Sequence, residues 1–315
     1  MQNPYLNIDR IEFMVTYRCT GRCKHCSVGD RVAHPGPHAH VRHDAAIETV
    51  RWLAQHFSVS SVMTFGGEPL LYPDIVCAIH QEATNQGIKT RQLIANGFFS
   101  RDAQKIQSVA VRLQAAGVNN LLLSVDAFHQ EIIPLEIVQH FAQSLLDTGI
   151  SGLRMSPAWL VNSAHENSYN AQTHALLAVF ASMGIPVGHG NDIFLSGNAA
   201  KYLKDYYPAI QPDLSIPCGS MPYTEPLTQV STLSIEPNGD VVVCSFVIGN
   251  IYRESIADIV SRYDPYAHEG MRAVVTGGVP ALMALAQEKG LDISCENECS
   301  ACRICQKIAR ELAEN

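Results

Sequence analysis

Three cysteines near the start of the chain have the spacing of metal ligands. Cys19, Cys23 and Cys26 are separated by three and then two residues, and they directly follow a short apolar run, Ile11–Val15. A fully ligated [4Fe–4S] cluster takes four cysteine thiolates. Three thiolates therefore leave one iron with an open position, which a substrate-like ligand can occupy.

Two other metal sites are compatible with these thiols. A zinc ion takes four Cys or His ligands, and His25 or His34 can complete such a set. Zinc-binding cysteines usually come as two separated pairs, however, and this triplet does not. A ferredoxin has shorter gaps and a further cysteine before a proline. The open-site iron–sulfur cluster fits the spacing best.

The residues after the second apolar run, Ser61–Phe65, strengthen a resemblance to a known family. The cysteine pattern resembles the signature of the radical S-adenosylmethionine (SAM) superfamily, with His25 at its usually aromatic position. After the second run come Gly66, Gly67 and Glu68 before a proline, which looks like the Gly-Gly-Glu-Pro motif of that family. The resemblance implies that Glu68 accepts hydrogen bonds from the SAM ammonium and that the glycines let the backbone approach closely.

The resemblance also implies SAM contacts at later strand ends. Asn96 closes the third run, and Ser124 and Asp126 close the fourth. Arg154 lies in the fifth run and is expected to pair with the SAM carboxylate, because a guanidinium binds carboxylates in a bidentate manner. Each position has a structural alternative, namely a turn, a helix cap or an internal ion pair.

Six apolar runs alternate with helix-like segments, which predicts parallel β/α units. The runs are Ile11–Val15, Ser61–Phe65, Thr90–Ala95, Asn120–Val125, Gly152–Ser156 and, less clearly, Ile185–Val187. The segments between them are Ala45–Gln55, Ile75–Gln86, Asp102–Ala116, Pro134–Thr148 and Ala171–Met183. Six units are too few for a closed eightfold barrel. We therefore expect an α/β fold, a partial (β/α)6 TIM-like barrel with its site at the carboxyl ends of the strands.

The pattern changes after Tyr207, where prolines interrupt the chain repeatedly. Ser231–Glu236 and Val241–Cys244 flank Pro237–Asp240, which predicts a hairpin. Helical stretches follow at Ser255–Tyr263, Pro280–Lys289 and Cys302–Glu314. We expect a core domain over residues 1–207 and a small cysteine-rich α+β extension over residues 208–315.

Six of the ten cysteines lie in this extension: Cys218, Cys244, Cys295, Cys299, Cys302 and Cys305. Their arrangement resembles the auxiliary-cluster extensions called SPASM and Twitch. Six thiols are too few for two further clusters, so one auxiliary [4Fe–4S] cluster is expected, held by four of Cys218, Cys244, Cys299, Cys302 and Cys305. Cys299 with Cys302 is the preferred C-terminal pair, and zinc is the alternative metal.

Composition limits the classes of partner. The chain has 315 residues, 47% hydrophobic and 17% charged, with a formal net charge of −8. An acidic chain is a poor candidate for nucleic-acid or membrane-surface binding. No signal peptide and no spanning run is recognisable, so a cytoplasmic location is expected. Cys77 is expected to be a thiol packed in the core. The segment that contains His34, His38, His40 and His43 is expected to form a solvated loop.

The resemblance implies that one electron from the cluster cleaves SAM to a 5′-deoxyadenosyl radical, which takes hydrogen from a peptide or small-molecule substrate. Peptide maturation, dehydrogenation and epimerisation are the expected outcomes, with Cys295 or Cys299 as a candidate thiol hydrogen donor. A flavodoxin or ferredoxin is the expected electron donor. A zinc-binding interaction protein and an electron-transfer iron–sulfur protein remain the alternatives.

Overall fold

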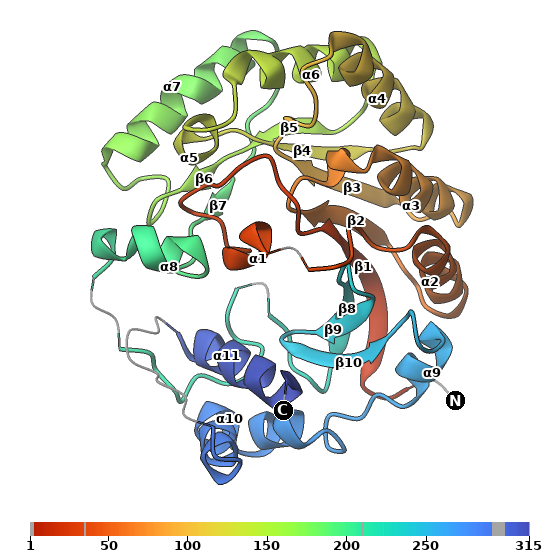
Figure 1. Ribbon diagram of the computed structural model, residues 1–315, viewed down its shortest axis with the longest axis vertical. Coiled ribbons are helices and arrows are strands. Elements are labelled where there is room, and N and C mark those ends of the chain that lie inside the picture. Colours follow the sequence, from red (N-terminus) through yellow and green to blue (C-terminus); the bar gives the residue numbers. More distant parts are fainter. Residues whose placement is uncertain (1–2, 35, 209–210, 223, 292–299, 315) are drawn as a thin grey trace.

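The computed structural model describes residues 3–34, 36–208, 211–222, 224–291 and 300–314. Its centre is an eight-stranded sheet in the order β10-β9-β8-β1-β2-β3-β4-β5. The parallel strands are β1 (Leu6–Thr16), β2 (Ser61–Gly66), β3 (Thr90–Ala95), β4 (Asn120–Ser124), β5 (Leu153–Ser156) and β8 (Val230–Ile235). The sheet is curved, as expected for a partial barrel (Figure 1).

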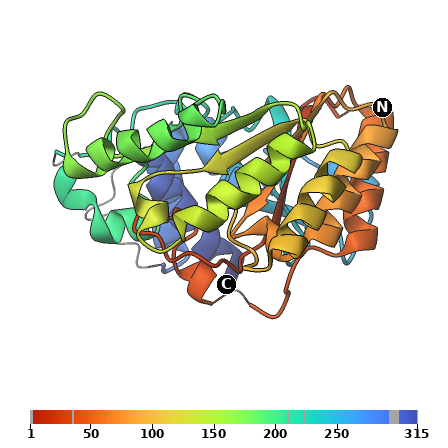
Figure 2. The same ribbon diagram turned by 90° about the horizontal axis from the view of Figure 1, so that it is seen from above.

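Helices cover the outer face of this sheet (Figure 1). They are α2 (His43–His56), α3 (Pro73–Asn85), α4 (Ala103–Ala115), α6 (Leu135–Asp147) and α7 (Ser168–Ser182). In α2 the buried residues Ala46, Val50 and Leu53 recur at helical spacing, so one face packs on the sheet and the other faces solvent. Seen from above, neighbouring helices lie side by side (Figure 2).

The sixth predicted strand is present in two short pieces. Val187 forms a parallel bridge to Met155 of β5. Further along, β7 (Asn191–Asp192) pairs in parallel with β6 (Ala158–Trp159), which follows β5 almost at once. The predicted α/β partial barrel is therefore confirmed, and its last strand is the weakest part of the alternation.

The C-terminal part continues the same sheet. Strand β8 pairs in parallel with β1, and β9 (Asp240–Val243) and β10 (Phe246–Asn250) follow as antiparallel strands. Three helices complete it: α9 (Ile256–Ser261), α10 (Glu269–Glu288) and α11 (Ala301–Glu314). The predicted hairpin is confirmed. The predicted boundary near residue 207 stays a prediction.

The sequence predicts one of the two helical runs in α10. It places a helix at Pro280–Lys289, whereas α10 spans Glu269–Glu288 and is broken at Gly278. Gly278 has φ of +67° inside α10, and Pro280 follows this kink. The proline therefore sits where a new helical run begins, a position at which its missing N–H costs little. The sequence signal thus marked the start of the second helical run, and the first run was not predicted.

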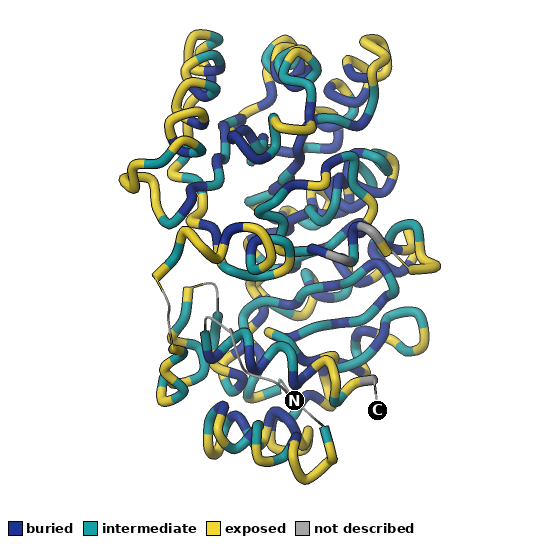
Figure 3. Tube along the Cα trace, turned by 60° about the vertical axis from the view of Figure 1, so that its left-hand side comes forward, coloured by how far each residue is buried: buried dark blue, intermediate teal, exposed yellow. Residues whose placement is uncertain are grey.

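Short elements lie around the carboxyl edge of the sheet. They are α1 (Asp30–Ala33), η1 (Pro69–Leu71), α5 (Ala127–Gln130), α8 (Asn198–Tyr202) and η2 (Lys204–Tyr206). The strands are largely buried, and the outer faces of the helices are exposed (Figure 3). Among the described helices, none has the length and apolar character that crossing a membrane requires.

Candidate functional site

The loop after β1 brings three thiols close together. Cys23 is buried, and Cys19 and Cys26 are partly buried. Burial raises the pKa of Cys19 to about 11, to which Glu68 and the Cys26 thiol contribute. Burial also raises the pKa of Cys23, with contributions from Asp126, Cys19 and Cys26. The raised pKa values of Cys19 and Cys23 mean that their thiolate forms need a bound cation or cluster to be stable in this loop.

The glycine-rich turn after β2 holds this loop through its backbone. The Gly67 N–H donates to the Thr16 carbonyl at 2.7 Å, and the Glu68 N–H donates to the Arg18 carbonyl at 2.8 Å. A Cβ atom on Gly67 would lie 2.2 Å from the Arg18 oxygen. Only glycine permits so close an approach. The two sequence motifs are thus joined directly, immediately before Cys19.

Glu68 is completely buried beside the cysteine loop. Its two carboxylate oxygens accept hydrogen bonds from the Leu70 N–H at 3.0 Å and from the Asn96 N–H at 2.7 Å. Burial raises the pKa of Glu68 to about 7, although these backbone donors oppose the rise. The Gly97 backbone N–H also lowers this pKa. A carboxylate has about four acceptor positions, so Glu68 can still accept a bond from a cationic ligand.

Asn96 is placed at the site, but its side chain contacts the loop. The Asn96 Nδ2 lies 3.3 Å from Thr20 Oγ1 and 3.5 Å from Cys19 Sγ. The Asn96 Oδ1 accepts a bond from the Phe98 N–H. The side chain of this predicted SAM contact therefore already helps to hold the cysteine loop against β3.

Ser124 and Arg154 lie on the two neighbouring strands. Ser124 pairs with Ser156 at the carboxyl ends of β4 and β5, and Arg154 pairs with Leu122 two positions earlier. The Arg154 guanidinium has no hydrogen bond or ion pair with any residue that the structure describes. Gly188 lies alongside its side chain, where a Cβ would be 3.4 Å from the Arg154 Cδ. Arg154 is therefore available to an anionic ligand.

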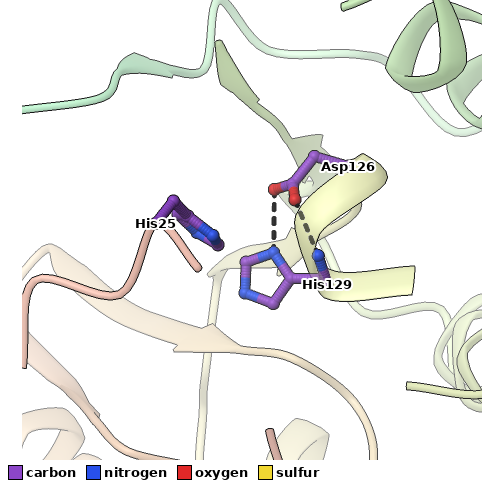
Figure 4. A group of neighbouring side chains, drawn as sticks. All are labelled: His25, Asp126 and His129. Carbon is purple, nitrogen blue, oxygen red and sulfur yellow. Dashed lines mark hydrogen bonds and ion pairs between the residues drawn. The ribbon is translucent and has the colours of Figure 1, made fainter. Parts of the chain in front are cut away.

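Asp126 and His129 form a buried pair at the start of α5 (Figure 4). One Asp126 oxygen accepts from the His129 N–H at 2.9 Å, and the other lies 2.8 Å from His129 Nδ1 and 3.1 Å from the Ala158 nitrogen. Burial alone would raise the pKa of Asp126, but the nearby His129 and His25 and the hydrogen bonds lower it. Both oxygens of this predicted SAM contact thus already serve protein groups.

His25 lies next to this pair. Its ring centroid is 4.7 Å from that of His129 and 5.1 Å from that of Phe128. The buried Nδ1 of His25 has no hydrogen-bond partner in the described part of the chain. Burial lowers the pKa of His25 to about 4, so its ring is neutral at physiological pH. A buried polar atom without a partner is expected where a cofactor completes the site.

These three groups also satisfy a geometric requirement for a metal ion. One ligand atom from each of His25, Asp126 and His129 lies within 4.8 Å of the others. In the pair, however, His129 Nδ1 and both Asp126 oxygens already make hydrogen bonds within the protein. The arrangement therefore fits a wall of the cofactor site better than a separate metal centre. The histidines at 34, 38, 40 and 43 do not form such a group among the described residues.

A second group of thiols lies in the C-terminal part. Burial raises the pKa of Cys305, and the thiols of Cys244, Cys218 and Cys302 contribute, so the four lie near one another. Cys244 occupies the turn between β9 and β10 with φ of +55°, a conformation that costs a non-glycine residue free energy. Cys295 and Cys299 lie outside the described residues. The preferred pairing of Cys299 with Cys302 therefore stays a prediction.

Two contacts to the cysteine loop were not predicted from the sequence. Asn198, at the start of α8, donates hydrogen bonds to the carbonyls of Cys23 and Cys26. Tyr17 donates to Glu236 at the end of β8. Each contact joins segments that are far apart in the chain, so no local sequence pattern predicts either of them.

Comparisons with known proteins agree with this geometry. Residues 13–147 match the radical SAM superfamily, and residues 228–306 match SPASM, an iron–sulfur cluster-binding domain. The chain is 26% identical to the GTP 3′,8-cyclase of Moorella thermoacetica over 39% of this chain and 36% of the relative. It is 30% identical to molybdenum cofactor biosynthesis protein 1 of Mus musculus over 40% of this chain and 18% of the relative.

The chain therefore matches little more than a third of the length of such a cyclase. Among solved structures, it is similar to native anSMEcpe with bound AdoMet, with a TM-score of 0.51 and 13% identity. That likeness covers 81% of this chain and 80% of the other, and it shows the fold. The radical SAM match implies a [4Fe–4S] cluster and SAM as cofactors. The SPASM match implies additional iron–sulfur clusters. The chain contains a radical SAM domain over residues 13–147 and a SPASM iron–sulfur cluster-binding domain over residues 228–306.

Proposed function

We propose that Cys19, Cys23 and Cys26 hold a [4Fe–4S] cluster at which SAM is cleaved to methionine and a 5′-deoxyadenosyl radical that takes hydrogen from a peptide or small-molecule substrate. The reduced cluster supplies the electron for this cleavage. The observation that carries the proposal is the position of Glu68. Its buried carboxylate accepts from the Asn96 N–H at 2.7 Å, and the Asn96 Nδ2 lies 3.5 Å from Cys19 Sγ, so Glu68 lies beside the cysteine loop.

The residues around the cluster would bind and orient SAM. Glu68 accepts from the SAM ammonium, and Arg154, which has no partner among the described residues, pairs with the SAM carboxylate. Ser124 at the end of β4 and the unpartnered Nδ1 of His25 are suited to the nucleoside part. Asp126 acts indirectly, since it fixes the orientation of His129.

The second group of thiols would hold an auxiliary [4Fe–4S] cluster. The proximity of Cys218, Cys244, Cys302 and Cys305 favours these four as its ligands. An auxiliary cluster can accept the electron that a substrate radical releases on dehydrogenation. Cys295 or Cys299 as a thiol hydrogen donor would instead give epimerisation. Peptide maturation stays one of the proposed outcomes.

The curated relatives support an enzyme but identify no substrate for this chain. One is named for a reaction of GTP and the other for molybdenum cofactor biosynthesis, and they match this chain over 124 and 125 residues. A flavodoxin or ferredoxin remains the proposed electron donor. We also propose a cytoplasmic location, because exposed thiols and iron–sulfur clusters are maintained in a reducing compartment.

Anaerobic reconstitution with iron and sulfide, followed by SAM and dithionite, tests the proposal. We expect about eight irons per chain, which two clusters contain, and release of 5′-deoxyadenosine. Cys23→Ala should abolish the release. Cys77→Ala, which changes a partly buried thiol of α3, should leave it intact. Tightly bound zinc in place of iron, or no 5′-deoxyadenosine from the reconstituted protein, would contradict the proposal.

A further inference from the structure

Asn198 contacts the part of the cysteine loop that carries two of the proposed cluster ligands. It is the first residue of α8 and follows Cys23 by 175 positions. Its Nδ2 donates to the Cys23 carbonyl at 3.0 Å, and its backbone N–H donates to the Cys26 carbonyl at 3.0 Å. One residue therefore binds the carbonyl groups of both cysteines.

These carbonyls define the turn between the two cysteines. The Cys26 N–H donates to the Cys23 carbonyl at 3.2 Å, so this oxygen accepts bonds from both Cys26 and Asn198. Fixing a carbonyl fixes the backbone torsions beside it, and these set the direction of each Cα–Cβ bond. Groups behind the ligands of a metal site orient the ligands in this way.

Glycines bring the two backbones into direct contact. Gly197 has φ of +53°, and a Cβ atom there would lie 2.6 Å from the carbonyl oxygens of both Cys26 and Ser27. A Cβ on Gly29 would lie 2.9 Å from the Gly197 Cα. Neither position accommodates a side chain without moving the loop. The amide of Asn198 is therefore held at the loop by packing as well as by its own bonds.

The helix that carries Asn198 is anchored beside the loop. Cys23 belongs to a small apolar cluster with Phe128, Leu160, Ile193, Ala199 and Leu203. Two of these residues, Ala199 and Leu203, lie on or directly after α8. The Asn198 hydrogen bond to Cys23 lies part-buried beside this cluster, and partial shielding from water strengthens a hydrogen bond.

We propose that Asn198 is a positioning residue for the SAM-binding cluster, which holds the Cys23–Cys26 turn so that both thiolates face one cluster. This inference rests on the proposed function. It assigns to α8, which follows the matched radical SAM region, a part in retaining the cluster.

The variant Asn198→Asp distinguishes a role in positioning the cluster ligands from a role in stabilising α8. The replacement has nearly the same shape, but its carboxylate cannot donate and would face the Cys23 carbonyl oxygen. At the first position of a helix, an acidic residue favours the helix dipole. A purely structural role in α8 therefore predicts an apoprotein whose melting temperature is unchanged or higher, with a normal cluster.

The positioning role predicts a different result for the reconstituted full chain. The SAM-responsive cluster should lose iron to a chelator roughly 10-fold faster in Asn198→Asp, a typical effect of losing a group behind a metal ligand. The reduced cluster should also show an altered EPR signal on addition of SAM. Asn198→Gln, which keeps the amide, should recover part of the retention. Lys201→Ala, on the same short helix, is the matched control.

The outcomes distinguish the inference from the function beneath it. If the wild-type chain shows a SAM-responsive EPR signal and Asn198→Asp matches it in signal and iron loss, the inference is overturned and the function stands. If the wild-type chain shows no such signal, both are overturned. Faster iron loss in Asn198→Asp, with Lys201→Ala at the wild-type rate and an intact apoprotein melting temperature, supports the inference.

Discussion

Tyr17 and Glu236 are joined by a hydrogen bond of 2.5 Å between the Tyr17 Oη and the Glu236 Oε2. Tyr17 lies two residues before Cys19, and Glu236 directly follows β8. Arg31 donates to both, at 2.9 Å to the tyrosine oxygen and 2.8 Å to the carboxylate. The segment before the first thiol group is thereby tied to the hairpin that leads to Cys244 of the second.

Tyr17→Phe should destabilise the apoprotein by about 1.5–3 kcal/mol, the range for a hydrogen bond to a charged group. The reason is that Tyr17 is buried and its hydroxyl serves Glu236 and Arg31. Denaturant unfolding measures the loss. Tyr266→Phe, at an exposed position, is the control. Equal effects of the two changes would show that the contact contributes nothing.

Glu68→Gln should weaken SAM binding by roughly 10- to 100-fold, because a neutral amide replaces a charge-assisted acceptor. The iron content should stay at the wild-type value, since no proposed ligand changes. The change in the EPR signal on titration with SAM measures the affinity. Glu82→Gln removes a carboxylate that instead pairs with Arg51 on the helical layer, and should leave SAM affinity unchanged. Wild-type SAM affinity in Glu68→Gln would remove Glu68 from the site.

Cys305→Ala should lower the iron content from about eight to about four per chain, because one of two clusters is lost. The SAM-responsive signal should persist, since that cluster depends on the loop after β1. Iron analysis and EPR on the same sample measure both quantities. Cys77→Ala should retain all the iron. Retention of all the iron in Cys305→Ala would exclude Cys305 as a ligand of the second cluster.

The free energy of unfolding of the apoprotein should fall in mild acid because of the buried His80. Its side chain is completely buried, and its Nε2 lies 2.8 Å from Thr64 Oγ1. Burial lowers the pKa of His80 to about 3, from 6.5 in the unfolded chain. The folded pKa is the lower one, so the stabilising contribution is present above pH 6.5 and is lost as the pH falls towards 3. The expected slope is about 1.4 kcal/mol per pH unit within this window.

Unfolding of the metal-free chain by denaturant at about pH 5.5 and about pH 4.5, both inside this window, measures the slope. His80→Gln keeps a polar partner for Thr64 but does not titrate, so its stability should change less between the two values. The difference between the wild-type chain and the variant isolates the histidine. An identical pH dependence in both would show that His80 does not stay neutral in the folded chain.

The sequence by itself determined the features that depend on neighbouring residues. Apolar spacing predicted five of the strands and the helices between them, because a helix or strand buries one face at a fixed period. The spacing of Cys19, Cys23 and Cys26 and the Gly66–Glu68 turn predicted the first thiol group and its carboxylate. The proline signal also predicted the helical run that begins after the break at Gly278, but the run from Glu269 to that break was not predicted.

The tertiary structure decided which distant segments meet. It placed β8 beside β1, brought Cys218 and Cys244 to Cys302 and Cys305, and set Asn198 on the carbonyls of the cysteine loop. No local pattern contains these pairings, since they follow from how the whole sheet curves and which faces remain to be buried. The sequence thus specified the chemical groups, and the packing of the barrel specified which of them lie next to one another.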